Sequence, residues 1–378
     1  MPGKTEYNEK SITVLEGLDA VRLRPGMYIG STSTKGLNHL IYEIVDNAVD
    51  EHLAGECDRI HVTLEKDGSA TIEDNGRGIP VGLHSSGVSA ARVVFSTLHA
   101  GGKFNNDVYK TSGGLHGVGS SVVNALSAYM DVEIRRDKSI YHDRYEKGKP
   151  IVKLEKGLLP VIGKTKETGT KINFLPDPEI FEETTVFDYD VLLKRMREQA
   201  FLNAGLTIEI ADHRHPEEDR HEVLCYEGGI RQFIEHIHHV RGLDPLSEQV
   251  IYFAGKKGEN AVEIAMQYNN SYNEVIMSFA NNVHTIDGGM HEVGYRNALT
   301  KTINEYGKKF GLLKDDNKLL GEDVREGLTA IISVKLTDCQ FESQTKVKLG
   351  NPEIKPFVEQ IVSEKLMDFL EENPTVAA

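Results

Sequence analysis

The sequence predicts a mixed α/β fold in which helices pack on a mixed sheet, in a chain of two domains. An amphipathic helix is expected over residues 37–53, because apolar residues recur there at helical spacing. Two alternating strands follow, over 60–64 and 70–73, with a hairpin turn at Asp67-Gly68. At 378 residues the chain is too long for one ordinary core, which favours two domains.

The second half shows the same mixture of strands and helices. Strands are expected over 261–267, 274–280 and 328–336, helices over 291–306 and from about residue 352, and a loop over 314–325. Between the halves, the hydrophilic stretch 213–219 is typical of a hairpin tip. We therefore place the boundary nearby, with residues 1–220 in the first domain and 221–378 in the second.

Bulk properties exclude several classes of protein. The formal net charge is −15, so any contact with DNA must come from a local basic patch rather than from the overall field. No apolar run approaches the roughly 20 residues that span a bilayer, and the polar N-terminus lacks the apolar core of a signal peptide. The three scattered cysteines fit a reducing compartment, so a cytoplasmic protein with no membrane partner is expected.

A carboxylate and an amide lie one turn apart on the first predicted helix, at Glu43 and Asn47. A nucleotide hydrolase needs a base that orients or deprotonates the attacking water, and it needs oxygen ligands for Mg²⁺. These two side chains can supply both from one helix face, and Asp50 and Glu51 lie on the same side of the helix. Taken alone, such a pair is more often a solvated helix surface than a site.

Asp74 lies at the end of the second predicted strand and begins the segment Asp-Asn-Gly-Arg-Gly-Ile-Pro. A carboxylate at a strand end can accept a hydrogen bond from an adenine amino group, and the glycines after it let the backbone approach a base. An ordinary turn explains the same residues equally well, because Asn-Gly is a strong turn signal.

A second glycine-rich segment, residues 113–119, precedes an expected helix over 118–126. Backbone N–H groups at such a helix start suit a polyphosphate. The segment is neither a Walker P-loop, which ends in Lys-Ser or Lys-Thr, nor a Rossmann fingerprint, which follows a first strand. A flexible hinge is the alternative. Lys103 and Tyr109, in the loop before it, are placed to reach phosphates, although lysines in polar loops are mostly solvated.

Two further groups of residues invite a functional interpretation. Gln344-Thr345-Lys346 follows a predicted strand, and a lysine from a second domain can sense a γ-phosphate, although a surface charge is the more common role. The run His236-Ile237-His238-His239 looks like a metal cluster. Neighbouring residues on a helix do not converge on one ion, however, so a surface helix is expected there.

Together these segments resemble the ATP-binding fold of the GHKL superfamily, which bacterial type II topoisomerases share with Hsp90 chaperones, sensor histidine kinases and MutL repair proteins. The chain is most similar to the B subunits of DNA gyrase and topoisomerase IV, over essentially its whole length. The segments that carry the resemblance are 17–22, 24–30, 43–50, 74–80, 99–104, 113–119, 122–127, 321–328 and 344–346. It implies a Bergerat-type sandwich of helices on a mixed sheet, followed by a ribosomal-S5-like transducer domain.

The resemblance assigns catalytic roles to two residues and a metal role to a third. Glu43 would be the general base. Lys346 would touch the γ-phosphate of ATP from the transducer domain. Asn47 would bind Mg²⁺, so ATP and Mg²⁺ are the expected cofactors.

The resemblance also surrounds the nucleotide with other residues. Asp74 would anchor adenine, with Thr170 acting through water and Gly78 lying under the base. The further residues that it places at the nucleotide are Glu51, Arg77, Lys103, Tyr109, Leu115, His116, Gly117, Val118, Gly119, Arg136, Gln344, Tyr28 and Tyr7. Tyr7 belongs to an N-terminal arm, residues 1–15, which would embrace a second protomer.

As such a protein, the chain would be the ATP-driven clamp of a DNA topoisomerase, in which ATP binding closes a homodimer and hydrolysis reopens it during supercoiling. The implied partners are DNA, the A subunit of DNA gyrase or its ParC-type counterpart, and aminocoumarin-type inhibitors in the ATP site. The chain stops near residue 378 without the acidic motifs of a cleavage domain, so we expect the ATPase part only. The alternatives are the B subunit of topoisomerase IV or, from another class, a MutL- or Hsp90-like clamp.

Overall fold

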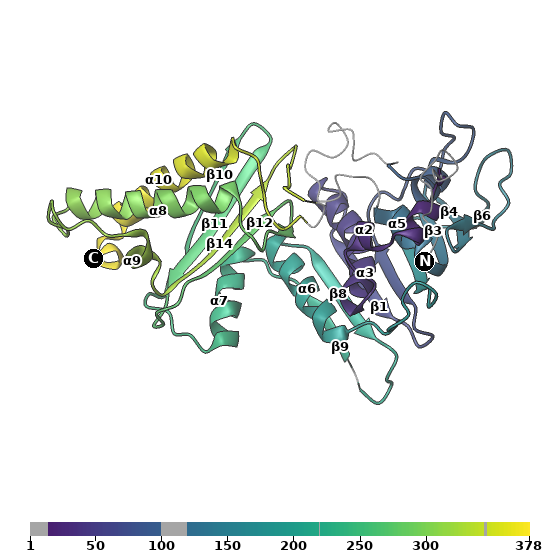
Figure 1. Cartoon of the computed structure of the whole chain (residues 1–378), viewed down its shortest axis with the longest axis horizontal. Helices are drawn as coiled ribbons and strands as arrows, with labels where there is room; N and C mark the ends of the chain where they lie inside the picture. The colour runs from purple at the N-terminus through teal and green to yellow at the C-terminus, as the bar shows by residue number, and fades with distance from the viewer. Residues whose placement is uncertain (1–13, 100–118, 219, 344–345) are drawn as a thin grey trace, which may run out of the picture.

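The computed structural model describes residues 14–99, 119–218, 220–343 and 346–378. In this part of the chain two sheets follow one another along the long axis of the molecule, each with helices packed on it (Figure 1). Among these residues, none of the helices is both long enough and apolar enough to cross a membrane.

The first sheet is mixed and has the order β5-β4-β3-β7-β2-β1-β8-β9, with β6 paired to β4. Its strands are β1 (Arg59–Leu64), β2 (Ala70–Asp74), β3 (Ser127–Arg136), β4 (Ser139–Glu146), β5 (Lys149–Pro150), β6 (Val161–Lys164), β7 (Gly169–Pro176), β8 (Thr207–Asp212) and β9 (Arg220–Leu224). The helices of this unit are α1 (Asp19–Leu23), α2 (Gly26–Ile29), α3 (Thr34–Leu53), α4 (Ala90–Ser96), α5 (Gly119–Ala125) and α6 (Tyr189–Leu202). Only the β1–β8 pair is parallel among the pairs described for this sheet.

The second sheet has the order β10-β11-β14-β12-β13, with β12 and β14 parallel. Its strands are β10 (Ile251–Lys257), β11 (Asn260–Tyr268), β12 (Val275–Ala280), β13 (Val283–His284) and β14 (Leu328–Lys335). The helices that accompany it are α7 (Ile230–Arg241), α8 (Met290–Lys309), α9 (Gly321–Arg325), α10 (Ile354–Glu372) and α11 (Pro374–Ala377). The predicted fold class, helices on a mixed sheet followed by a second sheet-containing unit, is therefore confirmed.

The core of the first unit is organised by α3, which begins three residues earlier than predicted. Its side chains Leu37, Leu40 and Ile41 have no solvent exposure, and Val45 is likewise fully buried. Burial of each such side chain contributes about 1.5–3 kcal/mol. The helix is thus held rigidly with one face on the core, while Glu43, Asp46 and Asn47 remain partly exposed.

The predicted loop over 314–325 is wrong in its last part, because residues 321–325 form α9. The N–H of Leu320 donates to the carboxylate of Asp323 at 2.7 Å, which caps the first turn. Val324 is buried in the second core, and this contact fixes the short helix against the sheet.

The helix predicted around the histidine run is present as α7, but the expectation that it lies on the surface is wrong for one face. Ile230, Phe233 and Ile234 are buried against the second sheet. His238 is on the same side, only 4% exposed, and its Nε2 lies 2.8 Å from Thr329 Oγ1. Alternate residues of β14 face α7 on one side and α8 and α10 on the other.

The two units are joined by an aromatic contact between α6 and α7. The ring of Phe201 stacks on Tyr226 at a centroid distance of 3.8 Å and on Phe233 at 4.8 Å. Buried amides support the contact, because Gln199 donates to the Asn282 carbonyl at 3.0 Å and Asn282 donates to Asn203 at 3.1 Å. This junction therefore combines apolar packing with directed hydrogen bonds.

The predicted domain division at residue 220 stays a prediction. β9 begins at Arg220 and still pairs with β8 of the first sheet, so the change from one sheet to the other falls between Leu224 and Ile251. The hydrophilic residues that predicted the boundary form the connection between β8 and β9, as a hairpin tip should.

Phe201→Ala should destabilise the protein by about 3–5 kcal/mol, because it removes a ring that is 2% exposed and stacked on two others. Urea denaturation followed by circular dichroism measures the loss. Val186→Ala, at a side chain that is 66% exposed, serves as the control and should change stability little. Equal stabilities for the two variants would show that the stack does not hold the junction.

Candidate nucleotide-binding site

The polar face of α3 carries the predicted base. Glu43 is half-buried, with 19% of its side chain exposed, and its Oε1 lies 2.8 Å from Nε2 of His39 one turn earlier. The ring of His39 thereby fixes the direction of the carboxylate. Sequence reasoning missed His39, although the i, i+4 spacing of His and Glu was available as a signal.

The start of α5 lies directly against Glu43. A Cβ added to Gly119 would lie 2.5 Å from Glu43 Oε2, so any larger residue here would displace the end of the Glu43 side chain. One residue later, Ser120 Oγ accepts a hydrogen bond from Asn47 Nδ2 at 2.8 Å. This bond orients the Asn47 amide, whose Oδ1 is the acceptor atom suited to a cation.

Asp74 lies at the end of β2, opposite Thr170 of β7 in the antiparallel ladder. The Gly76 N–H donates to its Oδ1 at 2.8 Å. The net effect of its surroundings raises the pKa of Asp74 to about 6: burial is the largest cause and the nearby charge of Glu51 adds to it, while backbone hydrogen bonds from Gly76 and Thr170 act in the opposite direction. A carboxylate that is costly to bury without a partner is suited to a ligand that donates hydrogen bonds.

Two glycines bring the backbone close together beside Asp74. Gly169 has a φ of 148°, and a Cβ there would lie 2.1 Å from the Asp74 carbonyl oxygen. Gly78 has a φ of 80°, and its Cβ would lie 2.7 Å from the Arg135 carbonyl oxygen. Both collisions are with backbone, which cannot rotate away, so these positions require glycine.

The turn after Asp74 is braced by charged side chains. Arg77 donates to Glu51 through Nη2 at 2.7 Å and Nε at 3.1 Å, a two-pronged contact, and its backbone N–H adds a third bond at 3.1 Å. Arg136 donates to the Gly78 carbonyl at 2.7 Å. Glu51 thus holds α3 to the turn, which is a role that the sequence did not reveal.

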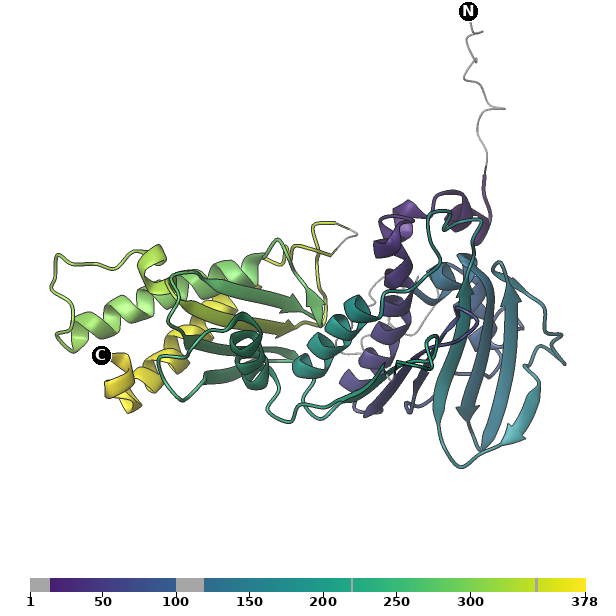
Figure 2. The same cartoon turned by 90° about the horizontal axis from the view of Figure 1, so that it is seen from below.

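Lys346 approaches α3 from the second unit. The segment that carries it reaches from the second sheet toward α3 in both views (Figures 1 and 2). On α3, burial raises the pKa of Asp46, whereas the opposite charges of Arg195 and Lys346 lower it and Glu43 raises it. Asp46 Oδ1 lies 3.9 Å from Arg195 Nη2. The structure therefore brings Glu43 and Lys346 to one region of the molecule.

Several predicted site residues lie outside the described residues. These are Tyr7, Lys103, Tyr109, Leu115, His116, Gly117, Val118 and Gln344. Tyr28 lies on α2, half-buried against the first core. The roles of all of these residues toward a nucleotide stay predictions.

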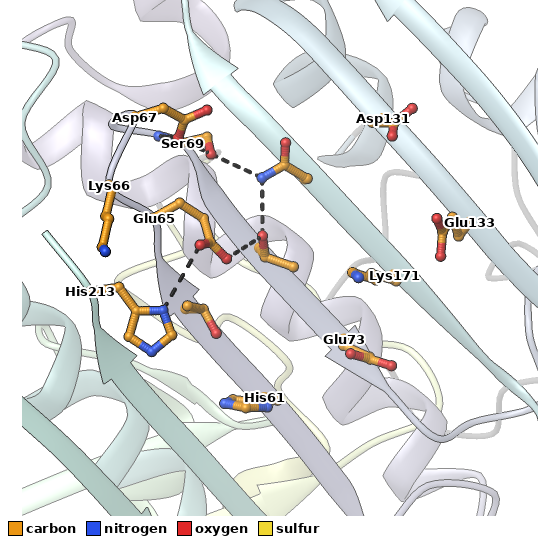
Figure 3. Close-up of a pocket in the computed structure, with 13 residues that line it drawn as sticks. His61, Glu65, Lys66, Asp67, Ser69, Glu73, Asp131, Glu133, Lys171 and His213 are labelled. Atoms are coloured by element: carbon orange, nitrogen blue, oxygen red, sulfur yellow. Dashed lines mark hydrogen bonds and ion pairs between the residues drawn. The ribbon is translucent and has the colours of Figure 1, made fainter.

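A separate hollow of about 640 Å³ lies on the other face of the first sheet (Figure 3). Side chains alternate along a strand, so Glu73 and Lys171 face this hollow while their neighbours Asp74 and Thr170 face the helices. Lys171 pairs in register with Glu73 on one side and Glu133 on the other. Such opposite charges on adjacent strands describe a solvated sheet face, and the hollow is not part of the nucleotide region.

Two family models match separate parts of the chain. The model described as histidine kinase-, DNA gyrase B-, and HSP90-like ATPase matches residues 32–179, which include α3 and Asp74. The model described as DNA gyrase B matches residues 229–378, which include Lys346. The fold and the first model define the class, a GHKL-type ATP-binding domain.

Similarity to individual proteins identifies the family within this class. The B subunit of DNA gyrase from Clostridium acetobutylicum is 53% identical over 373 residues, 98% of this chain and 57% of that protein. The crystal structure of the 43K ATPase domain of Thermus thermophilus gyrase B in complex with an aminocoumarin is 40% identical, with a TM-score of 0.81, and the match covers 95% of this chain and 91% of that one. The topoisomerase IV ATP-binding domain of Francisella tularensis, in complex with a small molecule inhibitor, is 32% identical, with a TM-score of 0.78, over 96% and 94% of the two chains.

The chain belongs to the DNA gyrase B family, within which it corresponds to the ATPase region of a type II topoisomerase. It spans 57% of the length of the Clostridium acetobutylicum protein. The predicted family is confirmed, and ATP binding follows from it.

Gly119→Ala should lower ATP turnover on the order of 10²-fold with little effect on stability, because the added methyl displaces the flexible end of Glu43. Steady-state hydrolysis and thermal melting measure the two quantities. Gly82→Ala is the matched control, since a Cβ there meets nothing within 4 Å. Unchanged turnover in Gly119→Ala would mean that the contact with Glu43 is not catalytically relevant.

Asp74→Asn should weaken nucleotide binding by about 1–3 kcal/mol while stabilising the nucleotide-free protein at neutral pH. The folded pKa of about 6 lies above the ordinary value of 3.8, so the native state binds more protons between these values and wild-type stability falls as pH rises through this window. The advantage of the Asn variant should therefore be larger at about pH 8 than at about pH 5. Thermal melts at both pH values and calorimetry with ADP test this. A melting difference that does not depend on pH would contradict the assignment.

Proposed function

We propose that this chain binds ATP with Mg²⁺ between α3, Asp74 and Lys346, and hydrolyses it to drive a dimerising clamp of a DNA topoisomerase. The observation that carries the proposal is the approach of Gly119, at the start of α5, to Glu43, which His39 holds, on the same helix where Lys346 of the second unit acts on Asp46. A base, a close backbone approach and a cation in one region are what phosphoryl transfer to water requires.

In this proposal Glu43 accepts a hydrogen bond from the attacking water and takes its proton as the γ-phosphate is transferred. His39 keeps the carboxylate in place and is a positioning residue, since it touches Glu43 at 2.8 Å and acts through it. Lys346 neutralises charge on the γ-phosphate. Its backbone φ of 57°, unusual for a residue with a side chain, is consistent with a position that is constrained for function.

The donor set around α3 fits Mg²⁺. The cation keeps most of its waters and needs one or two protein oxygens together with phosphate oxygens. Asn47 would hold it through Oδ1, the acceptor atom of an amide that is oriented by its bond to Ser120. When bound, Mg²⁺ would offset the negative charge of the phosphates.

Asp74 anchors the adenine amino group in this proposal, with Thr170 beside it and Gly78 under the ring. Arg77 and Arg136 hold the turn that forms the edge of the pocket. The residues proposed to complete the nucleotide shell are Glu51, Tyr28, Tyr7, Lys103, Tyr109, Gln344 and the lid residues Leu115, His116, Gly117, Val118 and Gly119.

We also propose the partners that the family implies. Residues 1–15 would clasp a second protomer on ATP binding, and the first and second domains, 1–220 and 221–378, would move relative to one another. DNA and the gyrase A protein are the proposed partners in the whole enzyme, in the cytoplasm, and an aminocoumarin is a proposed inhibitor. The Thermus thermophilus complex with an aminocoumarin supports the last of these.

Glu43→Gln tests the proposal, because it keeps the shape of the side chain and removes the base. Turnover should fall on the order of 10²–10⁴-fold while nucleotide binding survives. Coupled hydrolysis assays, calorimetry and light scattering with a non-hydrolysable ATP analogue measure turnover, affinity and dimerisation. Glu56→Gln, an exposed glutamate just beyond α3, is the control. Wild-type turnover in Glu43→Gln would remove Glu43 from its role, and a wild-type protein that neither binds nor hydrolyses ATP would overturn the function itself.

A further inference from the structure

The position of Lys346 depends on the residues that follow it. Its N–H donates to the Ser343 carbonyl at 3.0 Å, and its backbone lies in the left-handed region. Leu349, three residues later, is completely buried. Where Lys346 can reach is therefore determined by what holds residues 347–349.

These residues are bonded to the start of α8. Asp287 N–H donates to the Val347 carbonyl at 2.9 Å. Leu349 N–H donates to the Gly288 carbonyl at 3.1 Å, and Met290 N–H donates to the Leu349 carbonyl at 3.1 Å. Three backbone hydrogen bonds therefore connect residues 347–349 to residues 287–290. In addition, a parallel bridge pairs Gly289 with Leu349.

The contact requires glycine. Gly289 has a φ of 138°, and a Cβ there would lie 2.4 Å from the Leu349 carbonyl oxygen and 2.6 Å from its nitrogen. Because both atoms belong to the backbone, no side-chain rotation relieves the collision. Gly288 has a φ of 74°, which also favours glycine.

The connection continues into the long helices of the second unit. Met290 is the first residue of α8, and α8 approaches α10 so closely that a Cβ on Gly294 would lie 2.7 Å from the Lys355 carbonyl oxygen. Beneath the joint, buried side chains fix the loop, since His291 Nε2 lies 3.0 Å from Thr285 Oγ1 and Thr285 Oγ1 donates to the Ser278 carbonyl at 2.8 Å. A shift of residues 347–349 must therefore move the first turn of α8.

We propose that Gly288-Gly289 is the joint that positions Lys346 and passes its displacement by the γ-phosphate to α8 and α10. The inference rests on the proposed function, in which Lys346 contacts that phosphate. Gly289 is a positioning residue, because it touches neither nucleotide nor metal and acts through the backbone of Leu349. The joint gives the second unit a way to distinguish a triphosphate from a diphosphate.

Gly289→Ala tests the joint. Turnover should fall on the order of 10²-fold and affinity for a non-hydrolysable ATP analogue should fall with it, because Lys346 is misplaced. ADP affinity should stay unchanged, since ADP offers no γ-phosphate. The double variant with Lys346→Ala should be no worse than Lys346→Ala alone.

The matched control is Gly307→Ala near the far end of α8. A Cβ there would lie 2.6 Å from Leu313 Cδ1, so the variant is crowded on the same helix but away from Leu349. It should keep wild-type turnover and analogue affinity. Equal losses of ADP and analogue affinity in Gly289→Ala, or independent effects in the double variant, would overturn the proposal.

If Gly289→Ala does not fold, hydrogen exchange on the wild-type protein tests whether Gly288-Gly289 acts as the joint. Peptides covering residues 286–291 should exchange differently with the ATP analogue than with ADP, and Lys346→Ala should abolish that difference. Identical exchange with both nucleotides, in a wild-type protein that hydrolyses ATP, would refute the joint and leave the proposed function standing. Absence of hydrolysis by wild type would instead refute the function.

Discussion

The burial of one face of α3 is the constraint on which the rest of the site depends. Leu37 and Leu40 have no exposure, so the helix can neither rotate nor slide without exposing apolar surface. Because a helix fixes the angle between its residues, packing of the apolar face also fixes the positions of the residues on the polar face. Glu43, Asp46 and Asn47 are thereby held by the core rather than by the loops around them. In the proposed mechanism, the precision that catalysis needs would come from packing far from the chemistry.

At three positions, a glycine lets a second segment approach closely. Gly119 brings α5 against Glu43, Gly169 brings β7 against the Asp74 carbonyl, and Gly289 brings the segment after Lys346 against α8. A methyl group at either of the last two positions would collide with backbone, whereas one at Gly119 would meet the end of a side chain. The contacts at Gly169 and Gly289 therefore constrain the backbone itself, while substitution of Gly119 is expected to affect chemistry before stability.

Sequence reasoning predicted the features that depend on neighbours along the chain. The period of α3, the β1–β2 hairpin and the place of Asp74 at a strand end follow from local patterns. It missed His39, Arg195 and the burial of His238, because each depends on a partner contact or on which helix face meets a sheet. The parallel pairing of β1 with β8 is of the same kind, since nothing in either strand specifies a partner more than a hundred residues away.

Local pairing of charges at the candidate site matters more than the net charge of the whole protein. A net charge of −15 would repel a polyphosphate, and α3 and the end of β2 add carboxylates of their own to the candidate site. Two of these have nearby cations, since Glu51 binds Arg77 at 2.7 Å and Asp46 lies 3.9 Å from Arg195. Salt screens the overall field within about 10 Å, whereas such close pairs are screened much less. Local pairing therefore decides whether an anion is tolerated, and in this chain the cations come from α6, from the turn after β2 and from the second unit. A site assembled in this way holds its charge balance only when both units are in place. The aromatic junction at Phe201 joins the two units, so it supports the candidate site together with the carboxylates of α3.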